Sequence, residues 1–249
     1  MSGRVLVTGG GKGVGAAIVR TLLSAGYDID FTYRSSTAQA EALVAELAVA
    51  HPGRAIRALP LDLADKEAVA AFCTALEETT YYGYVHNAGQ SYDVLAAMMT
   101  QDKAEAIMQV NFWSMTQIVK ALIRPMMRAR SGRIVGIGSV AALEGNQGNS
   151  AYAATKGAML SYLRTLAVES AKRGVTVNYI APGFIDTDML APYAKYRAEM
   201  EKQIPAGRFA QPEDIAALAG FLLSPGASYI TGAVLPVDGG LTATIAFQR

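Results

Sequence analysis

Short apolar runs alternate along the chain with longer segments in which apolar residues recur every three or four positions. The first run, Arg4–Thr8, is followed by such a segment at Gly13–Ala25, and the alternation continues to the end of the sequence. Unbroken apolar runs such as Ile134–Ile137 are typical of parallel strands buried on both faces. The pattern therefore predicts an α/β fold, with a doubly wound parallel sheet of about seven strands and helices on both faces.

The boundaries of the elements follow from where each periodicity starts and stops. The expected strands are Arg4–Thr8, Asp28–Tyr33, Ala55–Leu61, Tyr84–Asn87, Arg133–Gly138, Thr176–Ala181 and Ala233–Val237. The expected helices are Gly13–Ala25, Thr37–Ala50, Lys66–Thr79, Asp102–Ala129, Ala151–Arg173 and Glu213–Leu223. Because no repeat, low-complexity tract or linker composition interrupts this series, the chain is predicted to form one domain over residues 1–249.

Composition excludes several classes of protein. Of the 249 residues, 51% are hydrophobic and 17% are charged, so a disordered chain is excluded, and the net charge of +1 argues against nucleic-acid binding. One cysteine, Cys73, and two histidines predict neither a disulfide framework nor a metal site. No apolar run reaches the length of a membrane span, and the first residues carry no signal-peptide pattern. We expect a cytoplasmic protein.

A glycine-rich turn follows the first predicted strand. It reads Thr8-Gly9-Gly10-Gly11-Lys12-Gly13-Val14-Gly15 and leads directly into the first predicted helix. Glycines in this place permit a tight turn and a close approach of the backbone to a pyrophosphate, which the helix N-terminus attracts. The turn predicts a dinucleotide site. The spacing is a variant of the usual G-x-G-x-x-G, and a turn that is glycine-rich by composition is the alternative.

The end of the second predicted strand bears on the choice of cofactor. A carboxylate there would hold the ribose hydroxyl of NAD, whereas a basic residue accommodates the 2′-phosphate of NADP. The sequence has Arg34 and Ser35 at this point, with Lys12 in the glycine-rich turn, and Asp30 falls within the strand. We therefore predict NADP (NADPH). The alternative is that Arg34 is a solvated surface charge.

Tyr152 and Lys156 lie four residues apart at the start of a predicted helix, so both project from one helical face. An ammonium beside a phenol stabilises the phenolate and lowers the phenol's pKa, which suits a tyrosine that reduces a ketone. Ser139 ends a strand, where open α/β sheets bind their ligands. It can hydrogen-bond a substrate carbonyl. A nucleophilic serine is the competing interpretation, but no histidine is near it and the context is not G-x-S-x-G.

With these residues the sequence resembles the short-chain dehydrogenase/reductase family, whose domain is of the Rossmann type, over essentially its whole length. The motifs that carry the resemblance are the turn Thr8 to Gly15, Asn87-Ala88-Gly89, Asn111, Ser139, Tyr152-x-x-x-Lys156 and Pro182-Gly183. One departure is His86, where the family usually has a second asparagine.

The resemblance implies a role for each matched residue. Tyr152 is implied as the general acid/base, Ser139 as the residue that orients the carbonyl, and Lys156 as the residue that lowers the tyrosine pKa and holds the nicotinamide ribose. Asn111 is implied to position a water that relays protons. Besides Tyr152 and Lys156, the implied cofactor-binding residues are Thr8, Gly9, Gly11, Lys12, Gly13, Val14, Gly15, Arg34, Ser35, Asp62, Leu63, Asn87, Ala88, Gly89, Pro182, Gly183, Ile185 and Thr187.

Two of these residues have a structural alternative. Asp62, implied to contact the adenine, could instead cap a turn. Asn111 could satisfy backbone groups where a helix is disturbed, which is compatible with the implied relay.

Within the family, the sequence is most similar to the 3-oxoacyl-(acyl-carrier-protein) reductases. The similarity includes the stretches 130–139, 145–148, 175–189, 204–208 and 229–233. It implies NADPH-dependent reduction of a 3-oxoacyl thioester in fatty-acid synthesis or in a related polyketide or polyene pathway, and a homotetramer. The alternatives are an enzyme acting on a free small ketone, sugar or acyl-CoA, and a dinucleotide-binding protein that has become a sensor or scaffold.

Basic residues gather near the ends of two predicted helices. Arg128 and Arg130 end one of them, and Lys172 and Arg173 end the helix that begins near Tyr152. A basic patch suits docking of an acidic acyl carrier protein, although cations are also favoured at helix C-termini. The segment around 184–208 holds Leu190 and several tyrosines and methionines, which predicts either a lid over an acyl chain or ordinary packing.

Overall fold

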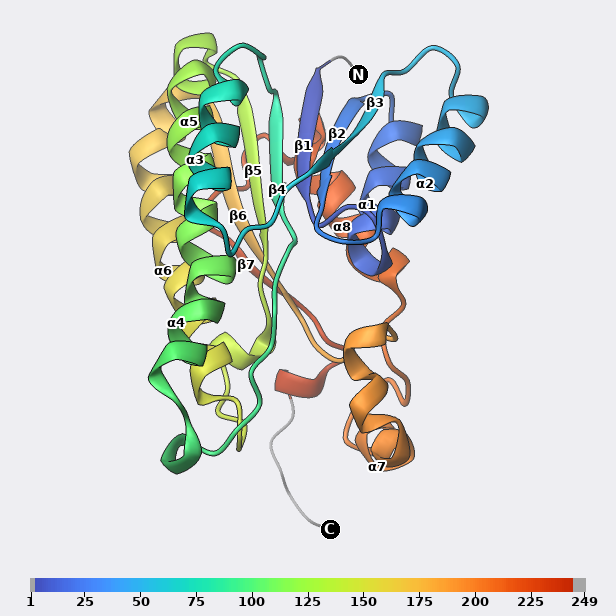
Figure 1. Cartoon of the computed structure of the whole chain (residues 1–249), viewed down its shortest axis with the longest axis vertical. Coiled ribbons are helices and arrows are strands. Elements are labelled where there is room, and N and C mark those ends of the chain that lie inside the picture. Colours follow the sequence, from blue (N-terminus) through green and yellow to red (C-terminus); the bar gives the residue numbers. More distant parts are fainter. Residues whose placement is uncertain (1–2, 244–249) are drawn as a thin grey trace.

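Seven strands form one sheet in the order β3-β2-β1-β4-β5-β6-β7 in a computed structural model, which describes residues 3–243 (Figure 1). Each neighbouring pair is parallel. The strands are β1 (Arg4–Thr8), β2 (Asp28–Tyr33), β3 (Ile56–Pro60), β4 (Gly83–His86), β5 (Gly132–Ile137), β6 (Val175–Pro182) and β7 (Val234–Val237). The predicted parallel α/β sheet is confirmed. The first and last residues of the predicted domain, 1 and 249, lie outside the described residues.

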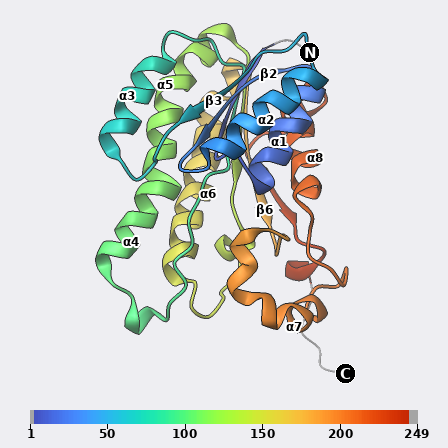
Figure 2. The same cartoon turned by 45° about the vertical axis from the view of Figure 1, so that its right-hand side comes forward.

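Helices cover both faces of the sheet, as predicted. They are α1 (Gly13–Ser24), α2 (Thr37–Ala50), α3 (Lys66–Leu76), α4 (Gln101–Met108), α5 (Ser114–Ala129), α6 (Ser150–Ser170), α7 (Arg197–Lys202) and α8 (Pro212–Leu223). Helices α1, α2 and α8 lie on one face, and α3 to α6 lie on the other (Figures 1 and 2). Alternate residues of β1 divide between the two cores, with Val5 and Val7 in one and Leu6 in the other. This alternation follows from the two-residue repeat of a strand.

The predicted helix Asp102–Ala129 is helical along its whole length, but it is not one regular α-helix. A π-helical turn, Gln109–Trp113, separates α4 from α5. Apolar periodicity runs through both helices, so the pattern does not reveal the extra residue of a π-turn. The helix predicted as Ala151–Arg173 ends as an α-helix at Ser170 and continues as a 3₁₀ turn, Ala171–Arg173. The sequence did not predict α7 or the 3₁₀ segment Asp188–Tyr196 before it.

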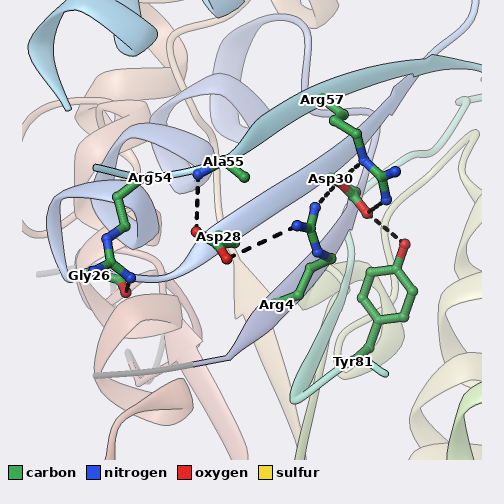
Figure 3. A network of polar contacts seen from close by, with 8 residues as sticks. All are labelled: Arg4, Gly26, Asp28, Asp30, Arg54, Ala55, Arg57 and Tyr81. Atoms are coloured by element: carbon green, nitrogen blue, oxygen red, sulfur yellow. Dashed lines mark hydrogen bonds and ion pairs between the residues drawn. The ribbon is translucent and has the colours of Figure 1, made fainter. Parts of the chain in front are cut away.

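A buried carboxylate links the three strands at one side of the sheet. Asp30 in β2 is inaccessible to solvent and accepts hydrogen bonds from Arg4 Nη1 at 2.7 Å, from Arg57 Nη2 at 2.6 Å and from the Tyr81 hydroxyl at 2.6 Å (Figure 3). Arg4 belongs to β1 and Arg57 to β3. Burial alone would raise the pKa of Asp30. The hydrogen bonds from Arg57 and Tyr81 and the charge of Arg4 outweigh it and hold the pKa below its ordinary value.

Two findings on the described residues bear on function. None of the helices within residues 3–243 combines the length and the apolar character that crossing a membrane requires. In the same part of the chain, no three His, Cys, Asp or Glu side chains gather in a way that could hold a metal ion.

Candidate active site

The strand order of the sheet reverses between β1 and β4, and in open parallel sheets such a reversal opens a crevice at the carboxyl ends of the strands. A single cleft lies there, between the ends of β1, β2, β4, β5 and β6. It is lined by most of the residues that the sequence predicted: Gly9, Gly11, Lys12, Gly13, Val14, Gly15, Arg34, Ser35, Asp62, Leu63, Asn87, Ala88, Gly89, Ser139, Tyr152, Lys156, Pro182, Gly183, Ile185 and Thr187. Thr8 and Asn111 are fully buried behind it.

The turn between β1 and α1 is shaped to receive a pyrophosphate. A Cβ atom on Gly15 would lie 2.0 Å from the carbonyl oxygen of Gly9 and 2.6 Å from Nδ2 of Asn87, so only glycine lets the helix begin this close to the strand. Within the described residues, no side chain caps the N-terminus of α1, and its first turn carries no acidic residue. The residues of its first turn, Gly13, Val14 and Gly15, line the cleft, so free backbone N–H groups and the positive dipole end are presented there. These features fit a dinucleotide.

Thr8 acts from behind the cleft. Its hydroxyl oxygen accepts hydrogen bonds from the backbone N–H groups of Asn87, at 3.2 Å, and of Ala88, at 3.4 Å. The amide of Asn87 in turn donates to the carbonyl oxygen of Gly9 at 3.0 Å. Thr8 thus joins the end of β1 to the segment after β4 and holds the two cofactor-facing loops together.

The end of β2 presents a positive charge to the cleft. Arg34 and Ser35 are exposed there, and within residues 3–243 the Arg34 guanidinium makes no ion pair. Lys12 is also exposed and pairs with Asp188 at 3.2 Å. The Asp30 carboxylate, which the sequence placed inside the strand, is held in its buried cluster and cannot reach a ribose in the cleft.

Asp62 follows β3 and is exposed at the rim of the cleft. Its Oδ1 accepts a hydrogen bond from the backbone N–H of Ala64 at 3.0 Å. The alternative role, capping a turn, is therefore present in the structure. Contact with an adenine stays a prediction for the same residue.

Ser139, Tyr152 and Lys156 converge on one wall of the cleft. Tyr152 and Lys156 lie in the first two turns of α6, and Ser139 follows the end of β5. The Ser139 hydroxyl oxygen accepts a hydrogen bond from the backbone N–H of Ala141 at 3.1 Å. Lys156 is buried, its Nζ donates to the carbonyl oxygen of Ile137 at 3.0 Å, and it lies 5.7 Å from the centre of the Tyr152 ring. The arrangement can present a hydroxyl and a phenol to one carbonyl oxygen.

The pKa values of Tyr152 and Lys156 are both shifted in this structure. Burial raises the pKa of Tyr152 to about 12, against a hydrogen bond with Ser139 that lowers it, and the charge of Asp93 raises it further. Burial also lowers the pKa of Lys156 to about 8. The expected lowering of the tyrosine pKa is therefore not found, because desolvation dominates at the phenol. Tyr152 is a protonated phenol at neutral pH, the form that can donate a proton.

Asn111 lies in the π-helical turn between α4 and α5. Its Nδ2 donates to the carbonyl oxygen of Gln90 and to the Thr155 hydroxyl, both at 2.9 Å, and its Oδ1 accepts from the backbone N–H of Gln90 at 2.8 Å. A Cβ atom on Gly89 would lie 3.4 Å from both Asn111 Oδ1 and Lys156 Nζ. Asn111 therefore fixes the loop after β4, and it does so next to Lys156.

Sequence reasoning did not foresee the environment of His86. The side chain is fully buried, and its Nδ1 lies 2.8 Å from the Tyr84 hydroxyl and 3.1 Å from the Thr8 hydroxyl. Burial, together with the charge of Lys156, lowers the pKa of His86 to about 3. The ring is neutral at physiological pH and acts as a hydrogen-bonding group behind the site, not as an acid or base.

The segment 184–208 borders the same cleft. Leu190, Tyr193, Tyr196 and Met200 line it, and the Tyr193 hydroxyl donates to Asp93 Oδ2 at 2.7 Å, which connects the segment to the loop after β4. Its place at the mouth of the cleft is consistent with a lid, and its movement stays a prediction.

The four basic residues predicted to dock a partner lie elsewhere. Arg128 and Arg173 share a small surface groove, and Arg130 Nη2 donates to the carbonyl oxygen of Lys172 at 3.1 Å. The structure thus brings the four together, at the C-terminal ends of α5 and α6. Tyr152 is at the other end of α6.

Comparison with known proteins identifies many relatives. A family model described as enoyl-(acyl carrier protein) reductase matches residues 9–242. The chain is 39% identical to a 3-oxoacyl-(acyl-carrier-protein) reductase FabG of Aggregatibacter actinomycetemcomitans, over 97% of this chain and 100% of that protein. It is also 39% identical to the reductase of the same name from Pseudomonas aeruginosa, over 97% and 98% of the two chains. The crystal structure of gox2181 superposes with a TM-score of 0.90 at 30% identity, over 98% of this chain and 96% of that one.

Proposed function

This chain belongs to the short-chain dehydrogenase/reductase family, and we propose that it reduces a 3-oxoacyl thioester, carried on acyl carrier protein, to the 3-hydroxyacyl thioester with NADPH. The observation that carries the proposal is the convergence of Ser139, Tyr152 and Lys156 on one wall of a cleft that fits a dinucleotide. The relatives named above, whose names state this reaction, support the choice of substrate. Fatty-acid synthesis, or a related polyketide or polyene pathway, is the context.

The nicotinamide cofactor, when bound, supplies the hydride that the carbonyl carbon takes up. The side chains of this protein provide the rest of the reaction. The Ser139 hydroxyl donates a hydrogen bond to the substrate carbonyl oxygen and fixes its position, and Tyr152 transfers its phenolic proton to the same oxygen. The Lys156 ammonium, 5.7 Å from the tyrosine ring centre, stabilises the phenolate that results. Asn111 holds the loop beside Lys156, where a proton can be returned through solvent.

Preference for NADPH over NADH rests on the charge at the end of β2. A 2′-phosphate carries negative charge, and the exposed guanidinium of Arg34 suits it. Lys12 lines the same cleft as Arg34 and forms an exposed ion pair with Asp188. Because exposed ion pairs are weak, the Lys12 ammonium can leave Asp188 and bind a phosphate. The Asp30 carboxylate of β2 is buried and bonded to two arginines, so it does not offer an acidic group to the ribose of NAD.

Reversing the charge at Arg34 tests this preference. For Arg34→Glu we expect kcat/KM with NADPH to fall at least tenfold, while kcat/KM with NADH stays within about threefold. The loss with NADPH arises because the variant removes one charge-assisted contact to the 2′-phosphate and adds a repulsion. Steady-state rates with the two cofactors in the same preparation measure both values, so NADH serves as the internal control. Equal losses with the two cofactors would show that Arg34 does not read the 2′-phosphate.

We further propose that Arg128, Arg130, Lys172 and Arg173 dock the acidic carrier protein. They gather at the end of α6 away from Tyr152, and a helix of 21 residues is about 30 Å long. This separation favours an arrangement in which the basic patch of one protomer serves the cleft of a neighbour in a homotetramer.

Charge reversal in the patch tests docking. We expect the double substitution Arg128→Glu and Arg173→Glu to raise KM for the carrier-bound thioester at least tenfold at low salt and to leave kcat/KM for a short free thioester unchanged. The matched control is Arg54→Glu, an exposed arginine near the N-terminal end of β3 that donates to the carbonyl of Gly26. If the patch variant behaves like the control on both substrates, the patch has no part in docking. If the wild type turns over only the free thioester, acyl carrier protein is not its substrate carrier.

A further inference from the structure

The backbone N–H of Ser139 comes immediately after the ladder between β5 and β6 ends. The last ladder bond of β5 runs from the backbone N–H of Gly138 to the carbonyl oxygen of Ile180, at 2.8 Å. The next backbone N–H, that of Ser139, lies outside the paired part of β5 and has no strand carbonyl to donate to. After Ser139 the chain forms a short 3₁₀ helix, Val140–Ala142. A half-buried N–H without an acceptor costs free energy, so an acceptor nearby stabilises this turn.

A side chain from the neighbouring strand receives it. The backbone N–H of Ser139 donates to the hydroxyl oxygen of Tyr179, in β6, at 2.9 Å. The same hydroxyl lies 3.3 Å from the carbonyl oxygen of Ser139 and 3.4 Å from that of Lys156, where its own proton can be directed. One phenol therefore touches the backbone of two residues to which the proposed reaction assigns roles.

Glycine at position 138 makes room for this phenol. A Cβ atom on Gly138 would lie 1.7 Å from Cζ and 2.0 Å from the hydroxyl oxygen of Tyr179, so any other residue there would displace the ring. Tyr179 is 1% exposed and does not line the cleft described above. It cannot touch a substrate. Burial raises its pKa well above that of a free tyrosine, so it stays a neutral hydrogen-bonding group.

We propose that Tyr179 is a positioning residue for the reduction, whose hydroxyl fixes Ser139 relative to Tyr152 and Lys156. The inference rests on the proposed function, because it requires Ser139 to orient the substrate carbonyl. Ser139 sits on a segment that has left the sheet, and its hydroxyl is already turned toward Ala141. Its direction then depends on how its own backbone is anchored. The phenol supplies this anchor at the point where the strand no longer does.

Tyr179→Phe removes the hydroxyl and keeps the ring. We expect kcat for the 3-oxoacyl thioester to fall at least tenfold, as misplacement of an orienting group does, with the Kd of NADPH unchanged. In a Ser139→Ala background the same substitution is expected to change kcat less than twofold, because the group that Tyr179 positions is already absent. A purely structural role would lower activity by the same factor in both backgrounds.

The matched control is Tyr27→Phe. Tyr27 is also 1% exposed and its hydroxyl donates to the carbonyl oxygen of Leu223 at 2.9 Å, far from the cleft residues. It should lose a comparable amount of thermal stability and keep its kcat. An unchanged kcat in Tyr179→Phe, or equal effects in the two backgrounds, would overturn the inference. If the wild type binds NADPH but reduces no 3-oxoacyl thioester, the proposed function itself is wrong. The wild-type rate therefore distinguishes failure of the proposed function from failure of the role given to Tyr179.

Discussion

Tyr152→Phe lowers kcat for a 3-oxoacyl thioester about 1000-fold, the size of effect expected when a general acid is removed. The structure gives the physical reason. The Tyr152 phenol, whose pKa burial raises to about 12, is protonated at neutral pH, and it lies with Ser139 and Lys156 on one wall of the cleft. Phenylalanine keeps the ring and its packing but has no proton to give. NADPH consumption under saturating substrate measures the loss, and a fluorescence titration shows that the variant still binds NADPH.

Tyr162→Phe is the matched control on the same helix. Tyr162 is half-buried, packs edge-on against Phe112 and does not line the cleft, so removing its hydroxyl should leave kcat within about twofold. A Tyr152→Phe enzyme that keeps a tenth or more of the wild-type rate would show that another group donates the proton. The assignment of the general acid would then be wrong.

Asp30→Asn destabilises the fold by about 3 kcal/mol, the lower end of the cost of breaking a buried ion pair by removing one partner. In a chain of this size that corresponds to a fall in Tm of about 8 °C. Asp30 is completely buried and accepts hydrogen bonds from Arg4, Arg57 and Tyr81 (Figure 3). An amide there removes the counter-charge of Arg57 and leaves Arg4 with only its longer contact to Asp28. Urea unfolding at pH 7 measures the change in free energy of unfolding.

The same carboxylate makes stability depend on pH. Since its pKa is lower in the folded protein than in the unfolded chain, Asp30 contributes its stability above the ordinary pKa of an aspartate and loses it as the pH falls through the depressed value. The gap between wild type and Asp30→Asn should therefore close in acid. Asp28→Asn is the control. Its carboxylate is a third exposed and lies 3.9 Å from Arg4, so its loss should cost less than about 1 kcal/mol. Equal costs for the two variants would contradict the role given to the buried cluster.

The sequence predicted the parts of the fold that local patterns determine. Strand Arg4–Thr8 and helix Thr37–Ala50 were placed with their observed bounds, because apolar runs and periodic segments report burial directly. The cleft residues were placed equally well, since glycine-rich turns and residues at strand ends come together whenever parallel strands share one edge.

What the sequence did not predict depends on contacts between distant segments. The π-turn at Gln109–Trp113 is stabilised by Asn111 bonding to Gln90, and nothing in the local periodicity marks it. From the sequence, Tyr179 is indistinguishable from any other buried residue of a strand. Its role depends on the space left by the missing side chain of Gly138, which the tyrosine ring occupies. The four-residue spacing of Tyr152 and Lys156 predicts that the ammonium lowers the pKa of the phenol. It rises, since burial acts on the phenol more strongly than the ammonium does.

The rate of NADPH oxidation with a 3-oxoacyl thioester, set against the rate with the corresponding 2-enoyl thioester, tests the central claim most directly. The site offers a hydroxyl and a protonated phenol to one oxygen atom, which a 3-oxo group provides at the reacting position and a carbon–carbon double bond does not. We predict rapid turnover of the 3-oxoacyl substrate, lost in Tyr152→Phe, and none above background with the enoyl substrate. Turnover of the enoyl thioester alone would contradict the account.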